Sequence, residues 1–166
     1  MKIREIVTTT MLILAIITIS TTAASALSCS GDICVDPSGW QRGGGAFNMN
    51  TSPIQAAVDN AIAGDVICVA AGSYTDVDIA TSHLTLRGEG ADAVTVTAAS
   101  SSDHVFDVGA DYVNISGFTA TGTIASTTAG IYLRDRQHCN ISENNASNNG
   151  RGIYMYGSSN DNTLAN

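Results

Sequence analysis

The 166-residue sequence is poor in charged residues and above all in lysine. Lys2 is its one lysine, and charged residues make up only 13% of the chain. Residues 27–166 hold five arginines against fourteen acidic residues, a net charge of −9. Such a surface repels phosphate backbones, which excludes nucleic acid as a partner. Acidic polysaccharides are also disfavoured unless calcium bridges them, and the charge mainly favours solubility outside the cell.

Long hydrophobic runs are also absent. The apolar run at residues 11–19 is shorter than the roughly 20 residues that span a bilayer. It follows Lys2 and Arg4 and precedes Ala-Ser-Ala at residues 24–26, an order typical of a signal peptide over residues 1–26. An uncleaved membrane anchor is the alternative. A lipoprotein Cys29 is disfavoured because Leu27 stands one position too close to it. We therefore expect a secreted or cell-surface, extracytoplasmic protein.

Cysteine is sparse but suited to export. Four cysteines allow three complete pairings, and the sequence does not choose among them. Cys34 and Cys68 both lie in short strand-like segments, so a Cys34–Cys68 disulfide is the favoured prediction, with a local Cys29–Cys34 disulfide as the alternative. Cys139 falls at an inward position and is expected to pack as a small hydrophobic residue. No CxxC spacing is present, and we expect no metal site.

Helix-forming segments are rare, and one is predicted over residues 52–64. Ser52 is a suitable N-cap, Pro53 suits the first helical position, and Gln55 completes a capping box. Gly64 is expected to end the helix. The apolar positions share one face, as expected of a helix that covers one end of a core: Ile54, Ala57, Val58, Ala61 and Ile62. Residues 27–51, with three consecutive glycines at 43–45, are expected to form an irregular lead-in.

Residues 65–166 alternate apolar and polar side chains with a period of two, which indicates short strands. The apolar positions also recur at long intervals, with one column at Leu86, Ile115, Ile141 and Leu164, and another at Phe106, Ile131 and Ile153. The intervals shorten toward the low twenties. Repeats of this length without intervening helices indicate a solenoid. The sequence therefore predicts an all-β, right-handed parallel β-helix of about four coils. Asparagines cluster between the strands, where they are expected to form turns and ladders of stacked side chains.

Two stretches carry a resemblance to known proteins. SPIQAAVDNAIAGDVICVAAGSYTDVDI (52–79) resembles the opening of secreted right-handed β-helix proteins of the pectin-lyase-like superfamily. Residues 130–166 resemble repeats of the NosD-like and carbohydrate-binding or sugar-hydrolase β-helix group, and the composition is similar to archaeal surface proteins. The resemblance covers residues 52–166 and implies the fold. It does not choose a function, because the group includes lyases, epimerases, hydrolases and non-catalytic surface proteins.

An outward-facing aromatic cluster is the candidate binding site. Tyr132 and Tyr154 are expected to lie one coil apart, roughly 4.8 Å from each other. Tyr156 lies beside them, with Arg134 one coil below Tyr156. Such rings with adjacent donors suit the stacking of sugars, and ordinary cross-strand packing is the alternative. We expect carbohydrate binding at these four residues.

Catalytic and metal chemistry find weaker support. The acids at turns or outward positions are Asp103, Asp107, Asp111 and Asp135, near Arg134, Arg136 and His138. Asp107 aligns with tyrosines rather than with other acids, so the carboxylates are not expected to stack, and we assign no catalytic residue. NosD-like proteins suggest copper. The methionines and histidines do not share a column, so no copper site and no cofactor are expected.

Four asparagines begin N-x-S/T triplets, the acceptor signal for N-glycosylation: Asn50, Asn114, Asn140 and Asn145. Asn114 and Asn140 occupy outward positions of strands. Because the composition is rich in Asn, Ser and Thr, such triplets also arise without modification.

These features predict an exported, non-catalytic cell-surface scaffold that binds a polysaccharide or envelope glycan. The alternative is a polysaccharide-processing enzyme whose active residues lie mostly beyond Asn166. The last coil carries no capping segment, and an open coil exposes strand edges and apolar surface. We therefore expect the solenoid to continue into further repeats or to be covered by another domain.

Overall fold

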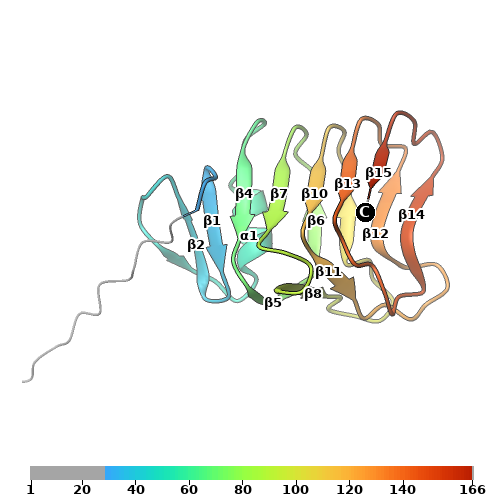
Figure 1. Ribbon diagram of the computed structural model, residues 1–166, viewed down its shortest axis with the longest axis horizontal. Helices are drawn as coiled ribbons and strands as arrows, with labels where there is room; N and C mark the ends of the chain where they lie inside the picture. The colour runs from blue at the N-terminus through green and yellow to red at the C-terminus, as the bar shows by residue number, and fades with distance from the viewer. Residues whose placement is uncertain (1–28, 166) are drawn as a thin grey trace, which may run out of the picture.

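A computed structural model describes residues 29–165, which form a solenoid with three sheets (Figure 1). The first sheet has eight strands in the order β15-β13-β10-β7-β4-β1-β2-β3. The second sheet has the order β11-β8-β5, and the third has the order β14-β12-β9-β6. Every pairing between coils is parallel, and each strand pairs with its equivalent one turn later, as predicted for a parallel β-helix.

Each of the first three coils contributes one short strand to each sheet. The first three coils supply β4–β5–β6, β7–β8–β9 and β10–β11–β12. The fourth supplies β13 and β14, with an isolated bridge from Asn145 to Thr119 in place of a strand in the second sheet. The strands of the coils are β4 (Val66–Val69), β5 (Gly72–Thr75), β6 (Val77–Ile79), β7 (Thr85–Gly88), β8 (Val94–Thr97), β9 (Phe106–Val108), β10 (Asn114–Ser116), β11 (Thr119–Thr121), β12 (Ala129–Arg134), β13 (Asn140–Ser142), β14 (Arg151–Tyr156) and β15 (Thr163–Ala165).

The register confirms both predicted columns. In the first sheet, Ile115 pairs with Leu86 on one side and with Ile141 on the other, and Ile141 pairs with Leu164. In the third sheet, Ile131 lies between Phe106 and Ile153. The column members of the inner coils are buried, and their side chains fill the core of the solenoid.

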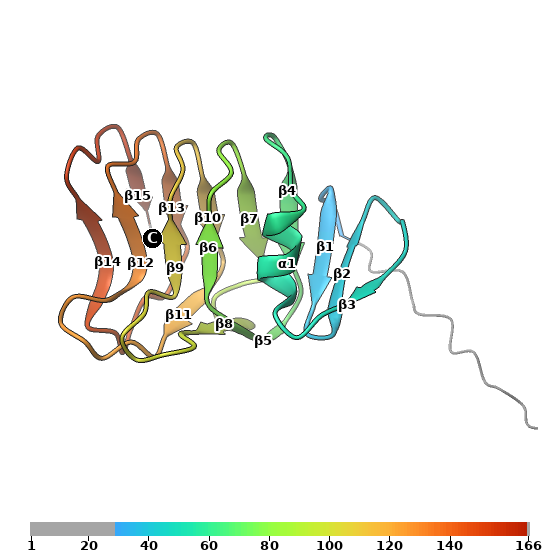
Figure 2. The same ribbon diagram turned by 180° about the vertical axis from the view of Figure 1, so that it is seen from behind.

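The predicted irregular lead-in is wrong, because this segment forms strands. They are β1 (Ile33–Asp36), β2 (Gly39–Arg42) and β3 (Asn48–Met49). β1 pairs parallel with β4, while β2 and β3 pair antiparallel and extend the first sheet past the coils (Figure 2). The chain reverses between β1 and β2 at Asp36, whose Oδ1 accepts hydrogen bonds from the N–H groups of Ser38 and Gly39. The short length and mixed pattern of these strands hid them from the periodicity argument.

The helix forms but is shorter than predicted: α1 spans Pro53–Asp59. Ser52 makes no side-chain capping bond, so the predicted capping box is absent. Gln55 instead bonds the backbone of Asp78 in β6, donating to its carbonyl and accepting from its N–H. Ile62 lies beyond the helix end and is 66% exposed. In Figure 2, α1 lies beside β6, in line with the third sheet, where it closes the side of the core at the first coil.

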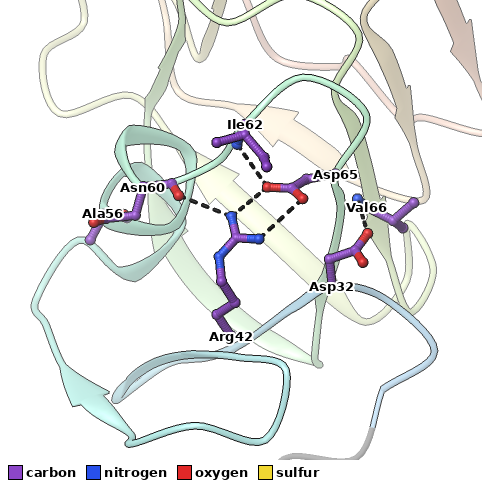
Figure 3. Close-up of polar contacts among 7 residues, drawn as sticks. All are labelled: Asp32, Arg42, Ala56, Asn60, Ile62, Asp65 and Val66. Atoms are coloured by element: carbon purple, nitrogen blue, oxygen red, sulfur yellow. Dashed lines mark hydrogen bonds and ion pairs between the residues drawn. The ribbon is translucent and has the colours of Figure 1, made fainter.

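An ion pair connects the hairpin of β1 and β2 to the helix and to the first coil (Figure 3). The Arg42 guanidinium at the end of β2 donates to both carboxylate oxygens of Asp65 and to the Asn60 carbonyl at the helix C-terminus. Asp65 also accepts from the Ile62 N–H at 2.7 Å. These bonds, above all the one from Arg42, hold the pKa of the largely buried Asp65 carboxyl below its ordinary value.

Asparagine side chains form cross-coil bonds at the corners. The Asn144 side chain donates to the Ile115 carbonyl at 2.8 Å and accepts from the Phe118 N–H at 3.0 Å, both in the preceding coil. Asn149 and Asn162 bridge the preceding coil in the same way. At these corners the asparagine side chains therefore bond to backbone groups of the preceding coil, where ladders of side chains bonded to one another were expected. Asn148, at φ 56°, shows the expected left-handed turn conformation.

Candidate functional site

The outer face of the third sheet gathers most of the candidate side chains. One outward column runs through four successive strands, because register pairs Asp78 with Asp107, Asp107 with Tyr132, and Tyr132 with Tyr154. Each member lies between two inward apolar residues, which point its side chain away from the core. The face therefore changes from carboxylates in the first two coils to aromatic rings in the next two.

The aromatic half is a continuous ladder of rings. His104 stacks on Tyr132 with ring centroids 4.0 Å apart, Tyr132 lies 5.6 Å from Tyr154, and Tyr154 lies 6.0 Å from Tyr156. The Arg151 guanidinium lies 3.8 Å from the Tyr154 ring centroid. Tyr132 and Tyr154 are thus partly covered by their neighbours, whereas Tyr156 is 53% exposed. Among the three predicted tyrosines, Tyr156 has the ring most open to a ligand.

A shallow pocket lies beside the ladder. It has a volume of about 390 Å³. Its lining consists of Asp107, Val108, Gly109, Tyr132, Arg134, Asp135 and Arg136. Arg134 is exposed and contacts two neighbours, Asp135 at 3.7 Å and the Tyr156 ring at 6.0 Å from its centroid. The pocket therefore combines an aromatic wall with two guanidinium groups and two carboxylates.

Arg136 has an unusual environment in this pocket. Its Nε atom is buried and has no hydrogen-bond partner. A buried donor without an acceptor is costly, by about 1–3 kcal/mol. Arg136 also contributes to the lining of the open pocket, so its guanidinium is a candidate donor to a ligand that binds there.

Asp107 pairs with Tyr132 on one side, as expected, and with a carboxylate outside the predicted set on the other side. Asp78 and Asp107 are register partners in neighbouring coils. Burial is the main cause that raises the pKa of each carboxyl above its ordinary value, and negative neighbours add to it. Asp103 acts on both, and Asp78 itself raises the pKa of Asp107. His104 opposes the shift, while its Nδ1 accepts a hydrogen bond from the Ala129 N–H at 3.0 Å.

The other acids of the predicted set serve local structure. Asp111 accepts from the Gln137 N–H at 3.0 Å, and Asp135 accepts from the Ser158 N–H at 2.8 Å. Asp103 accepts from the His104 N–H at 2.9 Å. Two of these bonds join successive coils, so the acids act at corners as the asparagines do.

No group of three or more metal-ligating side chains gathers anywhere within residues 29–165. Two of the three histidines, His83 and His138, share a column, but the Tyr112 ring lies between them, 4.5 Å from one and 4.6 Å from the other. Met49 is exposed in β3 and Met155 in β14, at opposite ends of the solenoid. The described residues therefore do not present the clustered soft ligands that copper requires.

The structure joins Cys34 to Cys29, with the Cα atoms 5.8 Å apart, and leaves Cys68 as a free thiol. The favoured Cys34–Cys68 prediction is therefore wrong, and the local alternative is present. Register nevertheless places Cys34 directly opposite Cys68 on neighbouring strands. Cys139 is buried beneath the corner before β13, as predicted.

Three of the four glycosylation triplets present an exposed asparagine: Asn50, Asn140 and Asn145. Asn114 is half-buried, and its Nδ2 donates to Thr85 Oγ1 at 3.1 Å. Attachment of sugar at any of the four stays a prediction, and Asn114 is the least accessible acceptor.

Sequence reasoning missed Asp78, His104 and Arg151 on this face. Asp78 could have been found by extending the Asp107 column back by the same 29-residue interval that separates Leu86 from Ile115. His104 carried no such signal, because its ring reaches Tyr132 from a position outside the column.

No curated protein and no solved structure shows significant similarity to the chain. The model of one family, described as periplasmic copper-binding protein (NosD), matches residues 58–166, which is all of the coiled region and the end of α1. Because this match covers well over half of the chain, the protein belongs to the NosD family.

Proposed function

We propose that the protein is an exported, non-catalytic scaffold that binds carbohydrate on the outer face of the third sheet. The observation that carries the proposal is the pocket beside Tyr132, which combines an aromatic wall with the guanidinium groups of Arg134 and Arg136. A sugar hydroxyl or ring oxygen is an acceptor of suitable size, and Asp107 and Asp135 accept hydrogen bonds from neighbouring hydroxyls.

Tyr156 supplies the apolar part of the proposed contact. Its exposed ring offers a flat surface for the C–H face of a sugar, with Arg134 beside it. Tyr132 and Tyr154 act mainly as the supports that fix the position of Tyr156 through the ladder. Pockets of this kind are typical of small polar ligands held by a few convergent groups.

Export is supported by the family, whose description is periplasmic. The signal peptide expected over residues 1–26 lies outside the described residues. Within residues 29–165, no helix is long and apolar enough to cross a membrane. The copper in the family's description finds no matching ligand set in residues 29–165, so no role for this metal is assigned to the chain.

Glycan-array binding of three proteins tests the proposal: wild type, Tyr156→Ala and Arg136→Gln. Both variants are expected to lose most of the signal for the glycans that the wild type binds. Tyr112→Asn is the matched control, because Tyr112 is also an exposed tyrosine in a ring stack but lies outside the third sheet. Asn tolerates the positive φ of 59° at that position. Unchanged binding in both site variants would refute the proposed site.

Glycan cleavage is a second candidate function, favoured by the adjacent Asp78 and Asp107. Neighbouring strands lie about 4.8 Å apart, close to the roughly 5–5.5 Å between the carboxyl groups of retaining glycosidases. A raised carboxyl pKa is also what a general acid needs. Release of new reducing ends or unsaturated products that is abolished by Asp107→Asn would establish this function. Binding without product release would establish the scaffold.

We further propose that the apolar end of the last coil is covered in the assembled protein by a further coil or by another chain. Leu164 is 45% exposed and Met155 38%, although their column partners Ile141 and Leu133 are buried. The exposed side chains continue the core columns, so they suit an added coil of the same kind.

A further inference from the structure

A second pocket lies at the opposite end of the solenoid from the aromatic ladder, where β1 meets β4. It has a volume of about 310 Å³ and is lined by Cys29, Ser30, Cys34, Cys68, Arg87, Glu89 and neighbouring residues. It therefore brings a disulfide and a free thiol together in one open hollow. Neither the proposed carbohydrate site nor the family description uses these groups.

Register places the free thiol next to the disulfide. Cys34 in β1 and Cys68 in β4 are direct partners on neighbouring parallel strands. Strands that pair in this way lie about 4.8 Å apart, within the roughly 4.4–6.8 Å between Cα atoms that a disulfide spans. The backbone therefore allows a Cys34–Cys68 bond without a change of register.

The loop between Cys29 and Cys34 packs directly against the thiol. A Cβ atom placed on Gly31 would lie 2.7 Å from the Cys68 sulfur and 2.6 Å from the Val66 carbonyl oxygen. Only a glycine fits between the disulfide loop and Cys68. The absence of a side chain at Gly31 thus brings the loop against the Cys68 sulfur.

Arg87 supplies positive charge at the same place. Its Nη2 donates to the Cys68 sulfur at 3.1 Å and to the Ser30 hydroxyl at 2.6 Å. The guanidinium therefore joins the thiol to the loop that carries Cys29. A cation next to a sulfur stabilises the negative charge that the sulfur carries when it attacks a disulfide.

We propose that Cys68, Cys34 and Cys29 form a thiol–disulfide exchange site. The Cys68 thiol gives its proton to solvent, and its thiolate attacks the Cys34 sulfur. The Cys34–Cys68 bond forms, the Cys34–Cys29 bond breaks, and Cys29 leaves as a thiolate that takes up a proton. The exchange changes no oxidation state and needs no external oxidant or reductant.

The exchange changes what the disulfide constrains. The Cys29–Cys34 bond joins two cysteines only five positions apart in the sequence, at the start of β1. The Cys34–Cys68 bond would join the hairpin to the first coil and close a much longer loop, which restricts the unfolded chain more strongly. It would also free Cys29, next to the N-terminal segment, as a reactive thiol. The site thus acts as a switch between a locally closed N-terminal edge and a cross-linked first coil.

Arginine positions make the two isomers easy to distinguish. Trypsin cuts after Arg42 and Arg87, so Cys29 and Cys34 fall in one peptide and Cys68 falls in the peptide 43–87. The purified protein is incubated at pH 8 without reductant, quenched with N-ethylmaleimide, and digested without reduction. Mass spectrometry then shows either an internal disulfide with alkylated Cys68, or a cross-link between the two peptides with alkylated Cys29.

The cross-linked pair is expected to appear with time in the wild type and in Cys139→Ser, which removes the buried thiol outside the pocket. It is expected to be absent in Cys68→Ser and to form about an order of magnitude more slowly in Arg87→Gln. Alkylation of Cys68 alone at every time point would overturn the proposal. A cross-link that forms more slowly when the protein is incubated at a tenfold lower concentration would also overturn it, because that dependence indicates exchange between molecules.

Discussion

The corner asparagines allow a quantitative prediction about the stability of the solenoid. Asn144 is 7% exposed, and its side chain bonds the Ile115 carbonyl at 2.8 Å and the Phe118 N–H at 3.0 Å. Asn144→Ala removes both bonds and leaves the buried Phe118 N–H without its acceptor, while Ile115 keeps its place in the β10 ladder. An unpartnered buried group costs about 1–3 kcal/mol and the lost bond to the Ile115 carbonyl about 1 kcal/mol, so the free energy of unfolding should fall by about 2–4 kcal/mol.

Asn145→Ala is the matched control on the adjacent residue. Asn145 is exposed, and its backbone bonds to Phe118 and Ala120 survive the change to alanine. We expect a change within about 0.5 kcal/mol for this variant. Urea unfolding of unglycosylated protein, followed by circular dichroism, measures both values. Equal losses in the two variants would refute the role of the asparagine side chain in bridging the coils.

Three further predictions concern charge and the open end of the solenoid. Asp65→Asn should lower the free energy of unfolding at pH 7 by about 1–3 kcal/mol. The folded pKa of Asp65 is lowered mainly by Arg42, so this stabilisation is present above the ordinary carboxyl pKa and is lost as the pH falls through the folded pKa. The gap between variant and wild type in chemical unfolding should therefore close on acidification, and a constant gap would contradict the ion pair. Asp107→Asn should have the opposite effect, because burial raises the pKa of the Asp107 carboxyl in the folded protein. The variant should be more stable than the wild type at pH 7, and this gain should vanish below about pH 4. A less stable variant at pH 7 would contradict the direction of the shift. The double substitution Met155→Lys/Leu164→Lys should reduce self-association, measured as the apparent mass in light scattering. If the wild type associates and the variant has the same apparent mass, the open coil is not the contact.

The coils could be predicted because their signal is repeated. Each inward residue needs an apolar partner one turn away, so the columns through Ile115 and Ile131 appear in the sequence as regular intervals. The same logic aligned Tyr132 with Tyr154 and Arg134 with Tyr156. A single register error would have moved every one of these side chains to the wrong face.

The N-terminal segment could not be predicted because it has no repeat. The strands β1 and β2 are stabilised by partners far along the chain, including the Arg42–Asp65 pair, and no local pattern announces such contacts. The predicted Cys34–Cys68 disulfide is wrong for a related reason. Strand pairing brought Cys34 opposite Cys68 as expected, but the loop at Gly31 also brings Cys29 within reach.

The sequence predicts which tyrosines face outward on this sheet, but it does not predict how their side chains pack. Alternation placed the tyrosines outside, but the stacking of His104 and Arg151 on them depends on side-chain directions that a pattern of two does not contain. Those contacts cover two of the rings and leave Tyr156 open. The unpartnered Nε of Arg136 is likewise a property of packing, not of spacing.

The most direct test of carbohydrate binding on this face is a residue-resolved titration. An oligosaccharide selected on the array is added to isotopically labelled protein, and backbone amide shifts are followed by NMR. Binding on the outer face of the third sheet predicts saturating shift changes that centre on residues 132–136 and 154–156. Saturable binding whose shift changes lie on the first or second sheet, with residues 132–136 and 154–156 unaffected, would contradict it.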